Sequence, residues 1–396
     1  MSKLVSVIVP VFNVEDYIRK SLDSILNQSF SFENIEVIMV DDASSDGSGK
    51  IIDEYSVKYD NFKAIHLDKN SGAAGRPRNI GINESNSDFI MFLDSDDYFS
   101  ETAIETLYNK IISDDELDIV LGGYVNIHGS NKQIVLPFKE SNDKYISDTT
   151  SYSNLMDINP AICAKIFRKS FLIENNIEFP ESIPGQDLVF FLDAFFNARN
   201  VLLLNKFIVY YRVLRFDDFN KSISLNITSK YIMGLIDAYS LTLDVCVNNK
   251  VSENLVKLLL LSHLQFFTNQ ILKDEVSSND LVLIFNSPSF QKFRNHVFFS
   301  SAKEFKLIFT NLVNGVFDNR NLIEYIKSNV EKEMYYRYDN IKNVFYHCKN
   351  ENKKLLVSLR VMKADNIYLK NKNKELHLEI RNMNSSKFFK VKRLFD

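Results

Sequence analysis

The sequence predicts an α/β fold, with a mostly parallel sheet in the first part of the chain and an all-helical region after it. In the first hundred residues, short β-branched runs alternate with segments of helical periodicity in steps of about 30 residues, as in right-handed strand–helix–strand crossovers. Strand signals nearly stop after residue 226. With 396 residues, the chain is long enough for roughly two to three domains.

Each predicted element of the first half has its own signal. The run 4–9 is apolar and β-branched, which favours a strand buried on both faces. From residue 15 onward, apolar residues recur at helical spacing. A helix at 48–59, capped by Asp46 or Ser45, is expected to bury Ile51, Ile52 and Tyr55. The other elements expected here are strands at 36–40, 62–66 and 89–93 and a helix at 77–85.

Beyond residue 100 the pattern is looser. The expected elements are helices at 101–113, 169–175 and 186–198, strands at 119–124 and 207–213, and an irregular polar stretch at 125–160. Since strand signals then end, we place a domain boundary near 225. The first domain, 1–225, has halves 1–100 and 101–225, and an all-helical domain follows at 226–345.

Residues 350–384 carry a heptad pattern of about four repeats. Leucine or methionine fills the d positions, and the a positions hold Leu359, Asn366, Asn373 and Ile380. Asparagine at an a position favours a parallel two-stranded coil, so we expect a coiled-coil homodimer. The alternative is a single amphipathic helix packed on its own domain.

The segment 385–396 interleaves four basic residues with five apolar ones. This pattern is typical of a weak membrane-surface anchor, so peripheral membrane contact through this tail is one interpretation. A frayed basic terminus is the other.

Composition excludes several classes of protein. Hydrophobic residues make up 45% and charged residues 25%, as in ordinary globular proteins. No apolar run reaches the roughly 18 residues of a membrane-spanning helix, and no signal peptide is visible, so we expect a cytoplasmic protein. A net charge of −4 gives no reason to expect a nucleic-acid partner. Three cysteines without CxxC spacing argue against a disulfide framework and against a zinc site.

Carboxylates follow two of the predicted strands, at the edge where a doubly wound sheet binds ligands. Asp41 and Asp42 follow the second strand, and Asp94, Asp96 and Asp97 follow the fourth. Crowded carboxylates repel, and keeping them ionised costs several kcal/mol unless a cation neutralises them. Such oxygen ligands suit Mg²⁺ or Mn²⁺, which share them with phosphate oxygens.

Arg76 and Arg78 follow the third strand and are suited to hydrogen-bond the same phosphates. Each motif alone has a structural interpretation: a helix-capping turn at 41–47, a solvated strand end at 94–97, or a surface loop around the arginines. Because the three motifs follow successive strands, a ligand-binding site is favoured over these structural interpretations. No GxGxxG follows the first strand, and no GxxxxGK[ST] occurs.

Together these segments resemble family 2 glycosyltransferases with the GT-A fold. The matching segments are 5–13, 40–48 (VDDASSDGS), 70–79 and 92–97 (FLDSDD), within about a quarter of the chain, and a looser similarity extends to about 225. The resemblance implies a GT-A catalytic domain, Rossmann-like with a mostly parallel sheet, and a nucleotide-diphosphate sugar donor, usually a UDP-sugar. It also implies a divalent metal, Mn²⁺ or Mg²⁺, and inversion at the anomeric carbon.

The resemblance also implies roles for single residues. By motif position, Asp42 contacts the uracil, Arg78 the uridine-diphosphate portion, Asp94 the ribose or sugar side, and Asp96 the metal. The full set of nucleotide-sugar-binding residues implied is Pro10, Phe12, Asn13, Asp42, Asn70, Arg76, Arg78, Asp94, Ser95 and Arg212.

Asp187 matches the catalytic aspartate of the family, and Gln186 stands where the family has glutamate. A helix N-terminus stabilises a nearby anion by roughly 0.3–1 kcal/mol, which keeps Asp187 ionised but makes it a weaker base. A helix-terminal residue without another role is the alternative. Arg212 or Arg215 is expected to contact phosphate, or else to be a solvated basic residue at a strand end.

The sequence therefore predicts an inverting glycosyltransferase that acts on a cell-surface polysaccharide, a teichoic acid (a polyol phosphate) or a lipid-linked glycan. Two rivals stay open. One is a metal-dependent nucleotidyl- or phosphotransferase; the other is a non-catalytic assembly scaffold, for which the departure at Gln186 argues. The expected location is the cytoplasm, at the inner face of the plasma membrane if the tail binds there.

Overall fold

The computed structural model describes residues 3–212, apart from 130, 139–140, 153 and 156–157, and residues 228–253. It also describes seven later positions, which are 255, 256, 259, 287, 288, 290 and 292. The chain divides into two compact units, 1–303 and 304–396, and all described residues belong to the first. The predicted coiled coil at 350–384, the tail at 385–396 and most of the predicted helical domain therefore lie outside the described residues.

Ten strands form one sheet in the described part of the chain, in the order β3-β2-β1-β4-β9-β6-β10-β5, with β7 paired to β6 and β8 to β10. The strands are β1 (Val5–Val11), β2 (Ile35–Asp41), β3 (Phe62–His66), β4 (Phe89–Phe92), β5 (Tyr98–Phe99), β6 (Leu117–His128), β7 (Asn131–Val135), β8 (Lys144–Ile146), β9 (Lys165–Arg168) and β10 (Asn200–Arg212).

The sheet is mixed, so the prediction of a mostly parallel sheet is wrong beyond the fourth strand. Strands β3, β2, β1 and β4 are parallel, because each of the first three is followed by a crossover helix. Strand β9 then runs antiparallel to both β4 and β6, and β10 is parallel to β6. Strands β5, β7 and β8 are also antiparallel to their partners.

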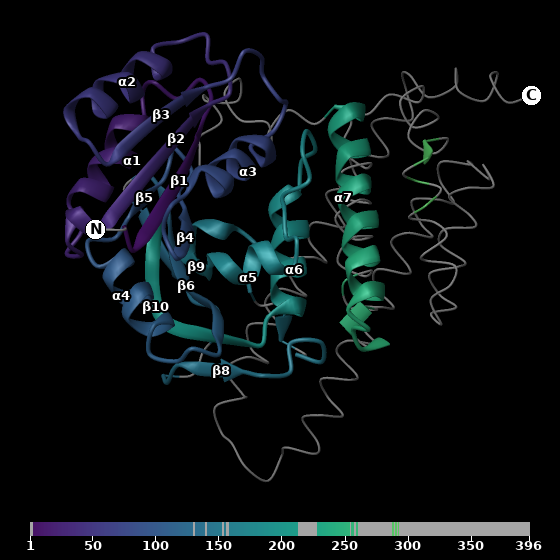
Figure 1. Ribbon diagram of the computed structural model, residues 1–396. Helices are drawn as coiled ribbons and strands as arrows, with labels where there is room; N and C mark the ends of the chain where they lie inside the picture. Colours follow the sequence, from purple (N-terminus) through teal and green to yellow (C-terminus); the bar gives the residue numbers. More distant parts are fainter. Residues whose placement is uncertain are drawn as a thin grey trace, which may run out of the picture. The chain divides into compact units, whose positions relative to one another are not determined.

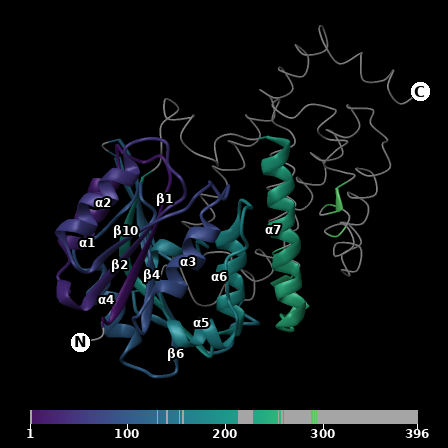
Figure 2. The same ribbon diagram turned by 45° about the horizontal axis from the view of Figure 1, so that its top comes forward.

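Helices cover both faces of the sheet. They are α1 (Ile18–Leu26), α2 (Ser48–Lys58), α3 (Gly75–Glu84), α4 (Ala103–Ile111), α5 (Lys169–Glu174) and α6 (Gln186–Asn197), followed by α7 (Ser229–Asn248). Helices α1, α2 and α4 lie on one side of the sheet, and α3, α5 and α6 lie on the other (Figures 1 and 2). Helix α7 packs against α6. None of the described helices combines the length and apolar character needed to cross a membrane.

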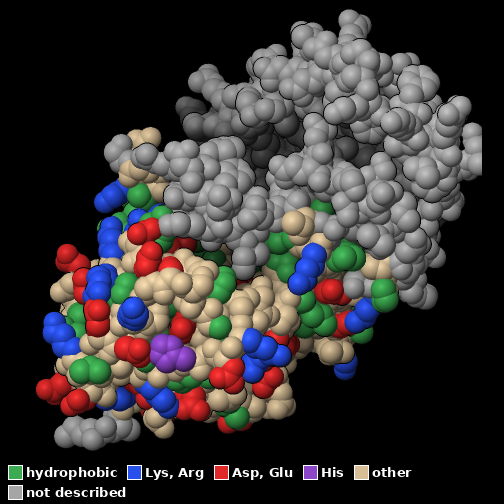
Figure 3. Space-filling model, turned by 90° about the horizontal axis from the view of Figure 1, so that it is seen from above, with side chains coloured by type: hydrophobic (Ala, Val, Ile, Leu, Met, Phe, Trp, Pro, Cys, Tyr) green, Lys and Arg blue, Asp and Glu red, His purple; other side chains and the backbone are tan. Residues whose placement is uncertain are grey.

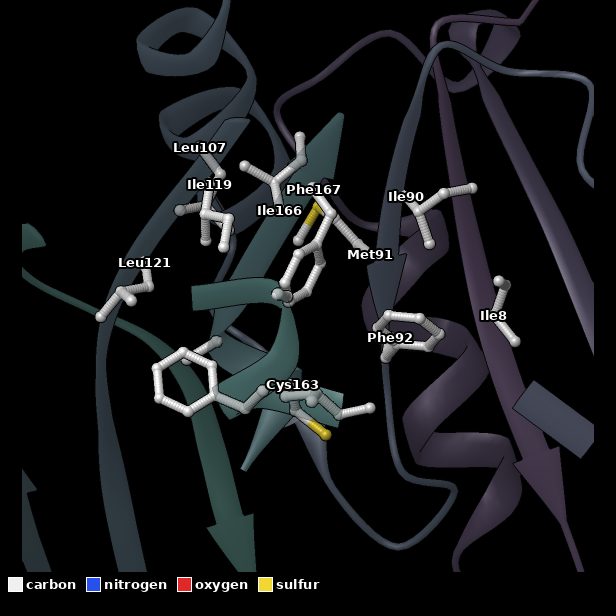
Figure 4. Packing of buried hydrophobic residues seen from close by; sticks show 14 of the residues in the cluster. Ile8, Ile90, Met91, Phe92, Leu107, Ile119, Leu121, Cys163, Ile166 and Phe167 are labelled. Carbon is white, nitrogen blue, oxygen red and sulfur yellow. The ribbon is translucent and has the colours of Figure 1, made fainter. Parts of the chain in front are cut away.

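The main core lies between the central strands and these helices. All seven residues of β1 are buried, which confirms the predicted strand buried on both faces. Helix α2 buries Ile51, Ile52 and Tyr55, as predicted. Figure 4 shows the part of the core shared by β1, β4 and β9, where Ile8, Phe92 and Phe167 contribute side chains.

Several elements differ from the sequence-based expectations. The stretch 125–160 is not irregular throughout, since it holds the end of β6 and all of β7 and β8. Strands β5 and β9 were not expected; they have two and four residues, too few to show a periodicity. The N-cap of α2 is Gly47 rather than Asp46 or Ser45, although Asp46 Oδ1 accepts a hydrogen bond from the Ser48 amide (2.9 Å).

The predicted domain boundary near 225 falls at positions that the structure does not describe, and it stays a prediction. Helix α7 begins four residues later, with the Thr228 side chain accepting from the Tyr231 amide at its N-cap. Its Gly234 lies against Pro184, where an added Cβ would come within 2.4 Å of Pro184 Cδ. Helix α7 therefore contacts the loop that leads into α6.

Candidate functional site

The loop after β2 is built around Asp42, whose side chain is 3% exposed. Its carboxylate accepts hydrogen bonds from the Ser71 amide (2.8 Å), the Ser71 hydroxyl (2.9 Å) and Asn70 Nδ2 (3.0 Å). Asn70 in turn accepts from the Gly72 amide (2.9 Å). Asp42 and Asn70 are therefore brought together, as predicted, and they join the loops that follow β2 and β3.

Asp41, the last residue of β2, takes a structural position. Its Oδ1 accepts from the Ser44 amide (3.0 Å), and its Oδ2 lies 3.1 Å from His66 Nδ1. The five carboxylates that follow β2 and β4 were expected to converge on one crevice. This expectation fails for Asp41, because its carboxylate contacts Ser44 and His66 at the β2–β3 edge instead. The neighbouring carboxylate of Asp53 contributes most to raising the pKa of His66.

The end of β1 meets the same loop. Asn13 has a positive φ of 51° and accepts through Oδ1 from the Ser45 amide (2.8 Å), while its own amide donates to the Ser44 hydroxyl (3.1 Å). Pro10 is buried inside β1, and Phe12 just beyond the strand is 41% exposed. Of this predicted group, Phe12 is thus the apolar side chain available to a ligand.

Arg78 links two carboxylates from distant segments. One of its terminal nitrogens, Nη1, donates to Asp187 Oδ1 (2.6 Å), and the other, Nη2, donates to Asp94 Oδ1 (2.5 Å). The arginine is 3% exposed, whereas each carboxylate is somewhat under a third exposed. Burial lowers the pKa of Arg78, but Asp187 and Asp94 together hold that pKa above its ordinary value, so the group stays charged.

Asp187 lies in the first turn of α6, after Gly185, whose φ is +76°. The left-handed conformation is open to glycine, and it lets the chain turn sharply into the helix. Burial raises the pKa of Asp187; Arg78 lowers it and Asp94 raises it again. The helix N-terminus and Arg78 thus hold a partly buried carboxylate whose pKa is raised above that of a free aspartate, whereas a weaker base was expected from the sequence.

The DSDD loop (residues 94–97) carries the densest negative charge of the site. Burial raises the pKa of Asp96 to about 6, and Asp94 adds to the shift. Asp97 is 1% exposed, and burial together with Asp96 raises its pKa. Arg212 is held to this loop, since its amide donates to Asp97 Oδ1 (2.8 Å) and its Nε to the Asp96 carbonyl (3.0 Å).

These contacts gather Arg78, Asp94, Asp96, Asp187 and Arg212 around the DSDD loop. Ser95 is buried in the same loop. Arg76 lies two residues before Arg78 at the start of α3, half-buried and without an ion pair to any described residue. The loop contacts of Arg212 use its amide and Nε, so the predicted phosphate contact of this residue is left to its terminal nitrogens.

The structure places three further residues here that the sequence did not single out. Lys165 is 2% exposed; burial lowers its pKa to about 7, and its Nζ donates to the Asn159 carbonyl (2.8 Å) and the Ala161 carbonyl. The ligand atoms of Cys163, Asp94 and Asp97 all lie within 4.8 Å of one another. Cys163 and Lys165, with Tyr211, also line a cavity of about 250 Å³. No periodicity or spacing marks these positions.

Gln186 is buried, with 8% of its surface exposed, and its Oε1 has no hydrogen-bond partner among the described residues. This atom faces the start of α3: a Cβ added to Gly75 would come within 2.5 Å of it and 2.3 Å of the Pro180 carbonyl. Gly75 is therefore required for the close approach of α3 to the segment that carries Asp187.

The donor set fits a divalent cation. Asp94, Asp96 and Asp97 are hard oxygen ligands on one short loop, and burial and the neighbouring carboxylates raise the pKa of Asp96 and Asp97, so a cation there would be favourable. Elsewhere the charge is mixed: on the face in Figure 3, acidic and basic side chains are interspersed over the described part of the surface.

Comparison with known proteins agrees with this arrangement. The family model described as "Glycosyl transferase family 2" matches residues 6–172. A poly(ribitol-phosphate) beta-glucosyltransferase of Bacillus spizizenii is 36% identical over 212 residues, which are 53% of this chain and 32% of that protein. The poly(ribitol-phosphate) beta-N-acetylglucosaminyltransferase TarS of Staphylococcus aureus is 33% identical over 213 residues, 53% of this chain and 35% of TarS.

A solved structure is similar as well. The crystal structure of S. aureus TarS 1–349 in complex with UDP superimposes with a TM-score of 0.61 and 25% sequence identity, covering 74% of this chain and 81% of that chain. The alignments with the two relatives span only about a third of the length of each.

Proposed function

Since residues 6–172 belong to glycosyltransferase family 2, we propose that this chain is an inverting glycosyltransferase that moves a sugar from a nucleoside-diphosphate sugar to an acceptor hydroxyl. One observation carries the proposal: the buried Arg78 holds Asp94 of the DSDD loop and Asp187 of α6 to a single guanidinium. A donor-side carboxylate and a candidate base are thereby held close to each other, which supports a reaction between a bound donor and an acceptor hydroxyl.

In the proposed reaction, Asp187 accepts the proton of the acceptor hydroxyl while that oxygen forms a bond to the anomeric carbon. The bond from this carbon to the diphosphate oxygen breaks, and the nucleoside diphosphate leaves with the bonding electron pair. Attack from the face opposite the leaving group inverts the anomeric carbon. The raised pKa of Asp187 favours this step, because a carboxylate with higher proton affinity is a stronger base.

The donor we propose is a UDP-sugar. The support is the likeness to a TarS structure that holds UDP, together with the Asp42–Asn70–Ser71 network at the end of β2. Because Asn70 and Ser71 orient the Asp42 carboxylate, it is positioned to meet the base or ribose of a nucleotide. Phe12, exposed at the end of β1, supplies an apolar surface for the base.

A divalent metal, Mn²⁺ or Mg²⁺, would be held by Asp96 with Asp94 beside it. Bound there, the ion would neutralise the charge that develops on the departing diphosphate. Arg212 and Arg76 are the cationic side chains that we expect to share this role.

The acceptor we propose is a hydroxyl of a polyol-phosphate polymer of the teichoic-acid type. Two of the most similar relatives are named for action on poly(ribitol phosphate), although this chain covers only about a third of each. Reaction at the cytoplasmic membrane face, contact of the 385–396 tail with lipid, and dimerisation through 350–384 belong to the same proposal.

The experiment is a product analysis with a donor labelled separately in the sugar and in the nucleotide (uridine and β-phosphate), incubated with Mn²⁺ and poly(ribitol phosphate). We expect the sugar label to enter the polymer and the phosphate label to leave as UDP. Phosphate or nucleotide label in the polymer would instead identify a phosphotransferase or nucleotidyltransferase. Neither label moving, with no hydrolysis of the donor, would favour a non-catalytic scaffold, the reading that Gln186 keeps open.

A further inference from the structure

Three side chains with metal-ligand atoms meet below the DSDD loop. Asp94 and Asp97 come from this loop, and Cys163 comes from the 3-10 turn Ile162–Ala164 just before β9. Their ligand atoms all lie within 4.8 Å of one another, and Asp97 and Cys163 are 1% and 3% exposed. Figure 4 shows Cys163 at the edge of the buried cluster, beyond Phe92 and Phe167.

One atom of this cluster lacks a partner. Asp97 Oδ1 accepts from the Arg212 amide (2.8 Å), but Asp97 Oδ2 is buried without any hydrogen-bond partner among the described residues. A buried carboxylate oxygen left unpaired is costly, and such atoms in native proteins are commonly satisfied by water or an ion. Asp94 differs in burial: its side chain is 28% exposed, and its Oδ1 accepts from Arg78 Nη2.

We propose that Asp94, Asp97 and Cys163 form a second cation site, which prefers an ion of the zinc class, such as Zn²⁺, Co²⁺ or Cd²⁺, to Mg²⁺. One thiolate and two carboxylates provide three ligands, and a water provides the fourth. Sulfur is what selects the ion, because thiolate ligands favour these metals, whereas carboxylates alone favour Mg²⁺ and Mn²⁺. On binding, the thiol proton passes to solvent and a metal–sulfur bond forms.

The ligand set differs from the sites that cysteine spacing identifies. From the sequence, three cysteines without CxxC spacing argue against a zinc site, and the proposed site departs from that expectation. A single cysteine that joins two carboxylates from a distant strand end leaves no such spacing, because the ligands are about 65 residues apart in the chain. Only the packing of the turn before β9 against the loop after β4 brings them together.

Occupation of the second cation site should affect sugar transfer, an expectation that rests on the proposed function. Asp94 is shared between the second cation site and the proposed donor site. A zinc-class ion bound to Asp94 and Asp97 therefore competes with the donor and its own metal, and we expect Zn²⁺ to inhibit sugar transfer in the presence of Mn²⁺.

Binding is tested by adding Co²⁺ to the full-length protein and recording the near-ultraviolet thiolate-to-cobalt charge-transfer absorption. We expect this band in the wild type and in the double variant Cys246→Ser/Cys348→Ser, which keeps Cys163. It should be lost in Cys163→Ser. This readout does not depend on activity, so it distinguishes failure of the second site from failure of the proposed function.

A second variant, Asp97→Asn, keeps the proposal testable if Cys163→Ser does not fold. Asp97→Asn keeps an Oδ1 acceptor for the Arg212 amide but removes the charged ligand, and we expect Co²⁺ affinity to fall about tenfold or more. The absence of the band in the wild type, or its persistence in Cys163→Ser, would overturn the proposal. Cobalt affinity unchanged by Asp97→Asn would do the same.

Discussion

Arg78 determines the electrostatics of the site at the scale of single residues. Its side chain is almost fully buried, and its two terminal nitrogens are each within 2.6 Å of a carboxylate oxygen. Burying a guanidinium is tolerated only when its charge is paired in this way. The two carboxylates depend on it equally, because without a cation between them they would repel each other.

Replacing Arg78 by glutamine should therefore destabilise the fold and change the base. Removing one partner of a buried ionic group costs roughly 3–5 kcal/mol, which should lower the melting temperature by several degrees. Since Arg78 lowers the pKa of Asp187, the acid limb of the pH–rate profile should move to higher pH. Arg76→Gln is the matched control for stability, and equal melting temperatures for the two variants would contradict this assignment.

Asp96 should show a conflict between stability and binding. Burial raises its pKa to about 6 from 3.8, so the folded protein binds the proton more tightly than the unfolded chain. The ionised carboxylate therefore costs stability at neutral pH, on the order of 1–3 kcal/mol, and this cost shrinks as the pH falls from about 6 towards 4.

Asp96→Asn should accordingly raise the melting temperature without metal at pH 7.5, with little effect at pH 4. The same variant should weaken Mn²⁺-dependent donor binding, measured by calorimetry with and without Mn²⁺. A variant that melts below the wild type at pH 7.5 would show that Asp96 is not under this strain.

The sequence singled out residues that contact one another in the structure, but it did not predict the contacts themselves. Asp42, Asn70, Arg78, Asp94 and Asp187 are brought into two connected networks. That Asp41 would turn to His66, or that Lys165 would be buried against the turn at 159–161, depends on tertiary packing. Neither residue type nor spacing carries that information, since a lysine in a short strand usually points to solvent.

At the scale of elements, the position of Asp187 depends on three helices. Helix α6 carries it, α3 approaches α6 through Gly75, and α7 closes on the Pro184–Gly185 turn through Gly234, Leu235 and Ala238. The close approach at Gly234 leaves no room for a side chain, because an added Cβ would lie 2.4 Å from Pro184 Cδ.

Gly234→Leu should displace the turn before Asp187 and lower the rate of transfer by about tenfold or more, since small misplacements of catalytic groups are costly. Donor binding should change much less, because the Asp42 network and the DSDD loop are not part of this contact. The control is Val247→Leu at the exposed end of α7. Equal loss of transfer in both variants would mean that α7 acts through overall stability instead.

The elements themselves were predictable where local signals are strong. Apart from β5, the strands and helices of the first hundred residues follow their periodicity, and the predicted strand at 62–66 coincides with β3. Strands β5 and β9 escape prediction because short strands acquire their conformation from pairing with neighbours in the sheet. The mixed topology follows from these short antiparallel insertions, which no periodic signal announces.

At the scale of the whole molecule, the heptad pattern at 350–384 predicts the oligomeric state. Deleting residues 350–396 should halve the mass measured by light scattering if a parallel two-stranded coil forms. Replacing Asn366 and Asn373 by leucine should keep the coil but loosen its choice of two strands. An unchanged oligomeric state, with the mass reduced only by that of the deleted residues, would favour the single amphipathic helix.

The central claim is that Asp187 removes the acceptor proton at a site organised by Arg78. Its most direct test is Asp187→Asn, which keeps an oxygen that can accept from Arg78 but cannot take up a proton at neutral pH. Sugar transfer from a UDP-sugar should fall by about 10²–10⁴-fold, while the donor dissociation constant in the presence of Mn²⁺ stays within a few-fold of the wild type. Near-normal transfer by this variant would contradict the account.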